Sequence, residues 1–230
     1  MPNTKKTKIV ATLGPAINNR ETLKQLMIAG VNVFRINFSH ADYEEVTKIV
    51  AIIRELNEEM GYHVACLADL QGPKLRVGVM ADGVNLAIDD VFTFTTEELA
   101  VGTQEKAFMT YKNFPRDVKA GEQILVDDGK LLFEVMATDG VANVTTKVLR
   151  GGPLKSKKGV NLPNTAISLP ALTEKDIKDA IFALSLQVDW MALSFVRNAA
   201  DLEDIHKLIA ENSDTSEYRT RVISKIEKPE

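Results

Sequence analysis

Strand-like and helix-like segments alternate at both ends of this chain, and this alternation limits its fold more than any other feature. Short runs rich in β-branched and apolar residues predict strands, and stretches with apolar residues at helical spacing predict helices between them. The first part of the chain reads strand, helix, strand, helix, strand over residues 8–67, and the same alternation resumes after Pro170 with a helix, strand, helix and strand that end near Ile226. This order predicts a parallel sheet covered by helices.

Between about Val77 and Lys158 the alternation stops. This stretch has no convincing amphipathic helix, and its short apolar runs are separated by Asp-Gly or Ala-Gly pairs at 82–83, 120–121, 128–129 and 139–140. Such pairs are typical of tight turns between antiparallel strands. We therefore expect an all-β domain at residues 78–157, inserted into one α/β domain made of residues 1–77 and 158–230.

Composition restricts the kinds of partner. The chain has 230 residues, of which 45% are hydrophobic and 26% charged, which is a globular composition with room for two domains. Its formal net charge of -4 gives no electrostatic reason to expect nucleic acid or an anionic membrane as a partner. The longest apolar stretch, Ile181–Val196, is too short to span a bilayer. The single cysteine, Cys66, lies in an apolar strand, which fits a buried thiol and a cytoplasmic location.

Polar side chains are placed where two of the predicted strands end. Arg35, Asn37 and Ser39 alternate along the second strand, so we expect them on one face, and Lys225 and Glu227 alternate in the same way at the last strand. Ligands bind at this end of the sheet in strand–helix–strand proteins. Taken singly, each pattern also fits an ordinary surface arginine or a surface Lys–Glu ion pair.

Asp69 and Arg76, which flank another strand end, extend this set. Three cations, a carboxylate suited to a metal and several amide or hydroxyl groups on one rim are a combination that binds phosphoryl groups. The Lys225 and Glu227 pair in particular suits a Mg²⁺ ligand beside a charge-neutralising ammonium.

Eight segments of the chain resemble motifs of the pyruvate kinase family, and they come in the family's order. They are Thr7–Pro15, Phe34–His40, Asp69–Arg76, Val126–Gly129, Lys157–Pro163, Leu169–Asp176, Ser194–Arg197 and Ile223–Glu227. The resemblance covers essentially the whole chain and is to the family's N-terminal portion. It implies a partial TIM-type (β/α) barrel, with about five of eight strands, and an inserted all-β barrel domain that acts as a lid.

The resemblance also implies an activity, namely transfer of the phosphoryl group of phosphoenolpyruvate to ADP, giving pyruvate and ATP in glycolysis. Arg35 would hold the phosphate of phosphoenolpyruvate, and Lys225 would stabilise charge on the phosphoryl group in flight, so both are expected catalytic and substrate-binding residues. The nucleotide-binding residues that it implies are Asn37, Phe38, Ser39, His40, Arg76 and Lys158. Ser194 is either a supporting group or a small packing residue, and Asp127 and Asp128 suit either a role in the closed site or a turn.

Two metal sites follow from the same resemblance. Glu227 would bind Mg²⁺ or Mn²⁺. The family's monovalent-cation site is matched here by Asn37, Ser39 and Asp69. Its remaining position, usually threonine, is Leu70, and Lys74 stands where potassium-dependent members carry glutamate. Leucine offers no side-chain oxygen, and an ammonium nearby would repel a cation. We therefore expect no requirement for K⁺.

The chain lacks the family's second metal-binding carboxylate, later barrel strands and C-terminal regulatory domain, so we expect these 230 residues to be inactive alone. The alternatives are a non-catalytic nucleotide-binding or structural fragment, and another barrel enzyme that handles phosphoenolpyruvate or pyruvate. The full-length form is expected to be a cytoplasmic homotetramer, with no nucleic acid or membrane partner.

Overall fold

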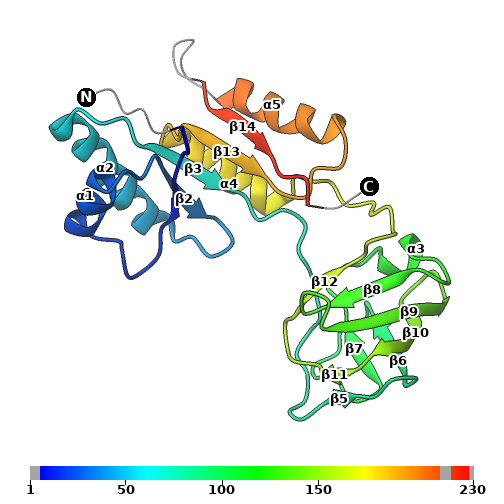
Figure 1. Cartoon of the computed structure of the whole chain (residues 1–230). Coiled ribbons are helices and arrows are strands. Elements are labelled where there is room, and N and C mark those ends of the chain that lie inside the picture. Colours follow the sequence, from blue (N-terminus) through cyan, green and yellow to red (C-terminus); the bar gives the residue numbers. More distant parts are fainter. Residues whose placement is uncertain (1–5, 213–218, 228–230) are drawn as a thin grey trace. The chain divides into compact units, whose positions relative to one another are not determined.

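The computed structural model describes residues 6–212 and 219–227 and forms two compact units (Figure 1). The first, the α/β unit, comprises the described residues up to Pro73 and those from Pro170 to Glu227. The second, the β unit, comprises Lys74–Leu169.

These divisions differ from the boundaries at 77/78 and 157/158 that the sequence analysis expects. The reason is strand pairing. Strand β4 (Leu75–Arg76) pairs with β12 (Gly159–Asn161), and β12 pairs with β8 (Gln123–Val126). Residues on both sides of the expected boundaries therefore belong to the sheet of the β unit.

A five-stranded parallel sheet, in the order β1-β2-β3-β13-β14, forms the centre of the α/β unit. Its strands are β1 (Val10–Thr12), β2 (Val33–Asn37), β3 (Ala65–Asp69), β13 (Trp190–Leu193) and β14 (Arg221–Ser224). Its helices are α1 (Arg20–Ile28), α2 (Tyr43–Met60), α4 (Glu174–Ser185) and α5 (Ala200–Asn212). The sheet is curled (Figure 1), which confirms the expected partial (β/α) barrel. None of the described helices is long and apolar enough to cross a membrane.

Helices α2 and α4 begin at side-chain caps, and α2 also ends at a glycine. The side chain of Asp42 accepts a hydrogen bond from the backbone N–H of Glu45 at the start of α2, and Gly61 ends this helix with a φ of +63°. Thr173 and Asp176 form a capping box at the start of α4.

The two faces of the sheet differ in character. Alternate residues of β2, β3 and β13 pack with the helices in the core, and they include Phe34, Ile36, Cys66, Met191 and Leu193. The intervening residues include Arg35, Asn37 and Asp69. The strand register places Asn37 beside Asp69, and Asp69 beside Ala192. The polar residues therefore gather on one face at the carboxyl ends of neighbouring strands.

The β unit is built on a seven-stranded sheet in the order β4-β12-β8-β9-β10-β6-β7. Its remaining elements are β5 (Asn85–Leu86), β6 (Val91–Thr95), β7 (Lys106–Phe108), α3 (Phe114–Asp117), β9 (Leu131–Thr138), β10 (Asn143–Arg150) and β11 (Gly152–Pro153). Val77, next to β4, bridges Met109, next to β7, so the first and last strands of this order meet and the sheet closes into a barrel. Phe92, Phe94 and Phe133 pack together in its core.

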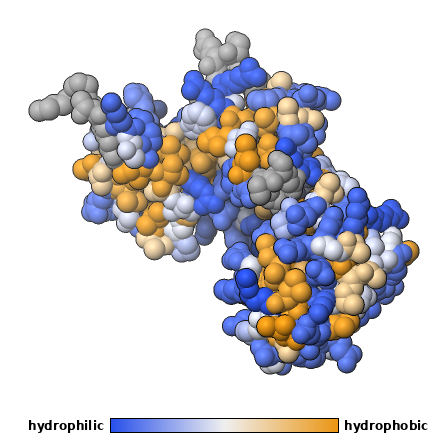
Figure 2. Space-filling model, turned by 45° about the vertical axis from the view of Figure 1, so that its right-hand side comes forward, coloured by the Kyte–Doolittle hydropathy of each residue, from blue (hydrophilic) through white to orange (hydrophobic). Residues whose placement is uncertain are grey.

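Apolar residues also reach the surface, as the orange areas in Figure 2 show for one view. Val10 of β1 and Ile223 of β14 are exposed. These two strands are the edges of the parallel sheet in the described part of the chain. An edge strand with exposed apolar side chains is a surface on which another segment can pair.

Candidate active site

Arg35, Asp69 and Lys225 meet at the carboxyl end of the parallel sheet. The side chain of Asp69 is only 5% exposed, and its Oδ2 accepts a hydrogen bond from Arg35 Nε at 2.7 Å. Its Oδ1 accepts one from Lys225 Nζ at 3.1 Å. Arg35 also donates to the hydroxyl of Thr12 at 2.9 Å. One buried carboxylate therefore orients two cations, each still 31% exposed, and leaves the three groups with one net positive charge.

Ser194 provides the second support for Lys225. Its buried hydroxyl accepts a hydrogen bond from Lys225 Nζ at 2.8 Å and donates one to the carbonyl oxygen of Leu70 at 2.8 Å. The ammonium is thus held from two sides, by Asp69 and by Ser194. Of the two roles that the sequence allows for Ser194, these contacts fit that of a supporting group.

Glu227 lies beside the same lysine. Its Oε1 is 3.6 Å from Lys225 Nζ, and its Oε2 accepts a hydrogen bond from the backbone N–H of Phe195 at 3.0 Å. Phe195 has a φ of +59°, which is unusual for a bulky side chain and is found mainly where the surrounding structure enforces it. Across residues 6–212 and 219–227, no group of three His, Cys, Asp or Glu side chains is placed to hold a metal ion. Glu227 fits a hard divalent cation only with further oxygen ligands.

The segment from Asn37 to His40 begins at the last residue of β2 and continues into a tight turn. Asn37 Oδ1 accepts a hydrogen bond from the N–H of Ser39 at 3.1 Å, and the N–H of Phe38 donates to the carbonyl oxygen of Asp69 at 3.0 Å. The ring of Phe38 is buried, whereas Ser39 is half-buried and His40 is exposed. A ligand at this segment can therefore reach Phe38 only through its backbone.

Two of the expected nucleotide-binding residues lie in the β unit. Arg76, on β4, donates to a backbone carbonyl oxygen at 2.9 Å. Lys158 Nζ lies 2.9 Å from Asp127 Oδ1. Hydrogen bonds from Lys158 and Lys130 hold the pKa of the Asp127 carboxyl below its usual range. Asp127 and Asp128 both have positive φ angles, of 54° and 56°, so the pair does form the sharp turn that Asp-Gly sequences predict.

Asn37 and Asp69, two of the three residues expected at a monovalent-cation site, already use their side-chain oxygens in hydrogen bonds. Asn37 Oδ1 accepts from Ser39, and both carboxylate oxygens of Asp69 accept from cationic side chains. Leu70, which has no side-chain oxygen, is buried. Its carbonyl oxygen accepts from Ser194.

Comparison with known proteins finds relatives over nearly the whole chain. The family model described as pyruvate kinase, barrel domain, matches residues 4–230. The pyruvate kinase of Corynebacterium glutamicum is 43% identical over 226 residues, which are 98% of this chain and 46% of that protein. The pyruvate kinase of Geobacillus stearothermophilus is 42% identical over 228 residues, which are 98% of this chain and 38% of that protein.

A solved structure is similar over the same part of the chain. The crystal structure of a pyruvate kinase from Cryptosporidium parvum matches with a TM-score of 0.88 and 34% sequence identity, and the match covers 97% of this chain and 46% of that one. The chain therefore spans less than half the length of these three relatives.

Proposed function

The chain belongs to the pyruvate kinase family, and from this premise we propose that the protein containing it transfers the phosphoryl group of phosphoenolpyruvate to ADP. In this reaction the bond between phosphorus and the enol oxygen breaks, and a bond forms between phosphorus and a terminal oxygen of ADP. The enolate left behind takes up a proton to give pyruvate. The observation that carries the proposal is the pair of cations, Arg35 and Lys225, held by the single carboxylate of Asp69.

The two cations have different tasks. Arg35 has a planar guanidinium that suits the phosphate of bound phosphoenolpyruvate. Lys225 has a compact ammonium that suits charge stabilisation on the phosphoryl group as it moves. In phosphoryl transfer the protein mainly positions groups and balances charge, so the supports given by Asp69 and Ser194 favour these roles.

A divalent metal, Mg²⁺ or Mn²⁺, would be held by Glu227, with substrate oxygens and water among its other ligands. When bound, it would neutralise charge on the phosphoryl oxygens. The charge balance of the site supports this. Arg35 and Lys225 contribute two positive charges and Asp69 and Glu227 two negative ones, so the four groups together are neutral without a metal.

For the nucleotide, we propose contacts from Asn37, Phe38, Ser39, His40, Arg76 and Lys158. Phe38 would contribute its backbone alone, since its ring is buried. We propose that the β unit, which carries Arg76 and Lys158, acts as a lid whose closure excludes water, because water competes with ADP as acceptor. We further propose that the reaction belongs to glycolysis in the cytoplasm and that the full-length protein is a homotetramer.

The test is an assay of pyruvate formation from phosphoenolpyruvate and ADP by the full-length protein with Mg²⁺. We expect turnover in the unsubstituted protein and, in Lys225→Met, a fall in kcat of about 10²–10³-fold with a much smaller change in the KM for phosphoenolpyruvate. Lys24→Met is the matched control, because Lys24 belongs to a surface ion pair with Glu59. Absence of turnover in the unsubstituted protein, or a kcat in Lys225→Met close to that of the control, would contradict the proposal.

A further inference from the structure

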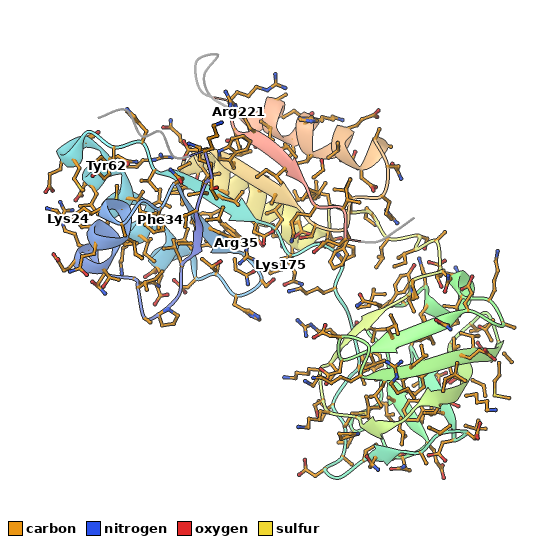
Figure 3. The ribbon with its side chains drawn as sticks, viewed as in Figure 1. Lys24, Phe34, Arg35, Tyr62, Lys175 and Arg221 are labelled. Atoms are coloured by element: carbon orange, nitrogen blue, oxygen red, sulfur yellow. The ribbon has the colours of Figure 1, made fainter. Side chains whose placement is uncertain are left out.

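A second polar cluster contacts the segment from Asn37 to His40 and has no part in the chemistry proposed above. Lys175, in the first turn of α4, donates from Nζ to the carbonyl oxygen of Phe38 at 2.8 Å and to the carboxylate of Asp179. The other carboxylate oxygen of Asp179 accepts a hydrogen bond from the hydroxyl of Tyr43 at 2.7 Å. Tyr43, Lys175 and Asp179, here called the α4 clamp, join the start of α2 and the start of α4 to this segment. Figure 3 labels Lys175 and, three residues before Phe38, Arg35.

The clamp is embedded in the core on one side. The side chain of Asp179 is 4% exposed. The ring of Tyr43 stacks on Phe182, with centroids 3.9 Å apart and planes within 4° of parallel. Phe38 meets the same Phe182 ring edge-on at 6.3 Å. Loss of solvent around the hydroxyl, together with the hydrogen bond to Asp179, raises the pKa of Tyr43 to about 12.

These contacts fix Phe38 at three points. Its N–H donates to the backbone carbonyl oxygen of Asp69, and its ring is in the core. Its own carbonyl oxygen accepts a charge-assisted hydrogen bond from Lys175. Lys175 is 47% exposed and would otherwise move in solvent, so its position depends on the buried Asp179 carboxylate. Asn37 and Ser39 lie on either side of Phe38. The directions of their side chains therefore depend on the orientation of the peptide groups that the clamp holds.

We infer that Tyr43, Lys175 and Asp179 are positioning residues that set the affinity of the segment from Asn37 to His40 for a nucleoside diphosphate. This inference rests on the proposed function, from which it takes the contact between this segment and ADP. The clamp acts on ADP more than on phosphoenolpyruvate. Arg35 and Lys225 have their own supports, Asp69 and Ser194, which are not part of the clamp.

The experiment uses the full-length protein and measures the KM for each substrate together with the Kd for ADP in the absence of phosphoenolpyruvate. For Lys175→Met we expect the KM and Kd for ADP to rise about tenfold, as for loss of a charged hydrogen bond, while kcat and the KM for phosphoenolpyruvate stay within about twofold. Lys207→Met is the matched control, since Lys207 forms an exposed i,i+4 pair with Glu211 on α5. It should leave all of these constants unchanged.

Tyr43→Phe separates positioning from direct contact, because it keeps the stacked ring and removes no charge. We expect it to raise the Kd for ADP about threefold, in keeping with loss of one neutral donor. If the Kd for ADP rises in Lys175→Met but is unchanged in Tyr43→Phe, Lys175 contacts phosphate directly. That result would overturn the inference.

Two further outcomes are decisive. An unchanged Kd for ADP in a folded Lys175→Met protein would overturn the inference. So would an equal rise in the KM values for ADP and phosphoenolpyruvate that comes with a lower Tm. Failure of the proposed function would appear as absence of turnover in the unsubstituted protein. The Kd for ADP can still be measured in such a protein, and it tests the clamp independently.

Discussion

Ser194 lies beneath the ammonium of Lys225, and its hydroxyl links that ammonium to the carbonyl oxygen of Leu70. Ser194→Ala removes one support of the lysine and leaves a buried carbonyl oxygen without its donor. We expect kcat of the full-length protein to fall about tenfold, and the KM for phosphoenolpyruvate to change less, because a loosened lysine stabilises the moving phosphoryl group poorly. Steady-state kinetics measure both quantities.

The control for this variant is Ser185→Ala. Ser185 also donates to a backbone carbonyl oxygen, that of Phe182, at 2.7 Å, but it lies in an exposed part of α4. It should retain full activity. If Ser194→Ala has the same kcat as Ser185→Ala, then Asp69 alone is sufficient to hold Lys225.

The residues around Asp69 also affect whether the protein needs potassium. Leu70 is buried without a side-chain oxygen to offer, and Asp69 uses both of its oxygens for Arg35 and Lys225. We expect the full-length protein to have the same activity in potassium and tetramethylammonium salts at equal ionic strength. Strong activation by potassium would contradict this. A potassium dependence gained by Lys74→Glu combined with Leu70→Thr would support it.

Sequence reasoning found the residues whose placement depends on strand alternation. Arg35 and Lys225 follow from a period of two along parallel strands, which brings their side chains to one end of one face. Lys175 could not be found in this way. Its contact with Phe38 spans 137 positions, and a lysine in the first turn of a helix has many ordinary explanations. Only the packing of α4 against the loop after β2 reveals it.

Helix α4 shows how buried acidic residues change which side of an amphipathic helix faces the core. The apolar pattern places Ile177 and Ile181 on the buried stripe with Ala180 and Leu184, but both isoleucines are exposed. Asp176 and Asp179 are buried instead. Each accepts specific hydrogen bonds, Asp176 from the N–H of Gly72 and Asp179 from Tyr43, which offset the cost of burying a carboxylate. The capping box was predictable because its partners are three residues apart, and these contacts were not.

The turn between β9 and β10 is the element for which we predict a pH dependence. Asp139 accepts hydrogen bonds from the N–H and the side-chain amide of Asn143 and from the N–H groups of Val141 and Ala142, and these bonds hold the pKa of its carboxyl far below the usual range. A carboxyl with a depressed pKa in the folded state adds stability above its unfolded pKa of about 3.9, and this contribution is lost as the pH falls through the folded value.

We therefore expect Asp139→Asn to lower the Tm of the β unit at neutral pH and to flatten its decline toward acid. Thermal unfolding at a series of pH values measures this. Asp82→Asn removes the same charge from another exposed turn and should leave the profile unchanged. Parallel Tm profiles for the unsubstituted protein and Asp139→Asn would show that the turn does not depend on the ionised carboxylate.

The two units of the whole chain were predictable in kind because their patterns have different periods. The residues at the boundaries of the β unit were not, and its closure into a barrel was expected only from the resemblance to the family. They depend on pairing between β4 and β12 and on the bridge between Val77 and Met109, which join residues far apart in sequence. No local sequence pattern predicts such pairings. The two units divide at 73/74 and 169/170, and not at the boundaries expected from the sequence.

For the chain as a whole, we predict that these 230 residues expressed alone form no measurable pyruvate. The described residues contain no set of three ligands for a metal ion, and the edge strands β1 and β14 expose Val10 and Ile223. The relatives with this activity are more than twice as long. The measurement compares the 230-residue chain with the full-length protein in the same assay, after circular dichroism has shown that both are folded. A folded 230-residue preparation whose turnover is abolished by Lys225→Ala would overturn the prediction and would mean that one carboxylate, Glu227, is enough to hold the metal.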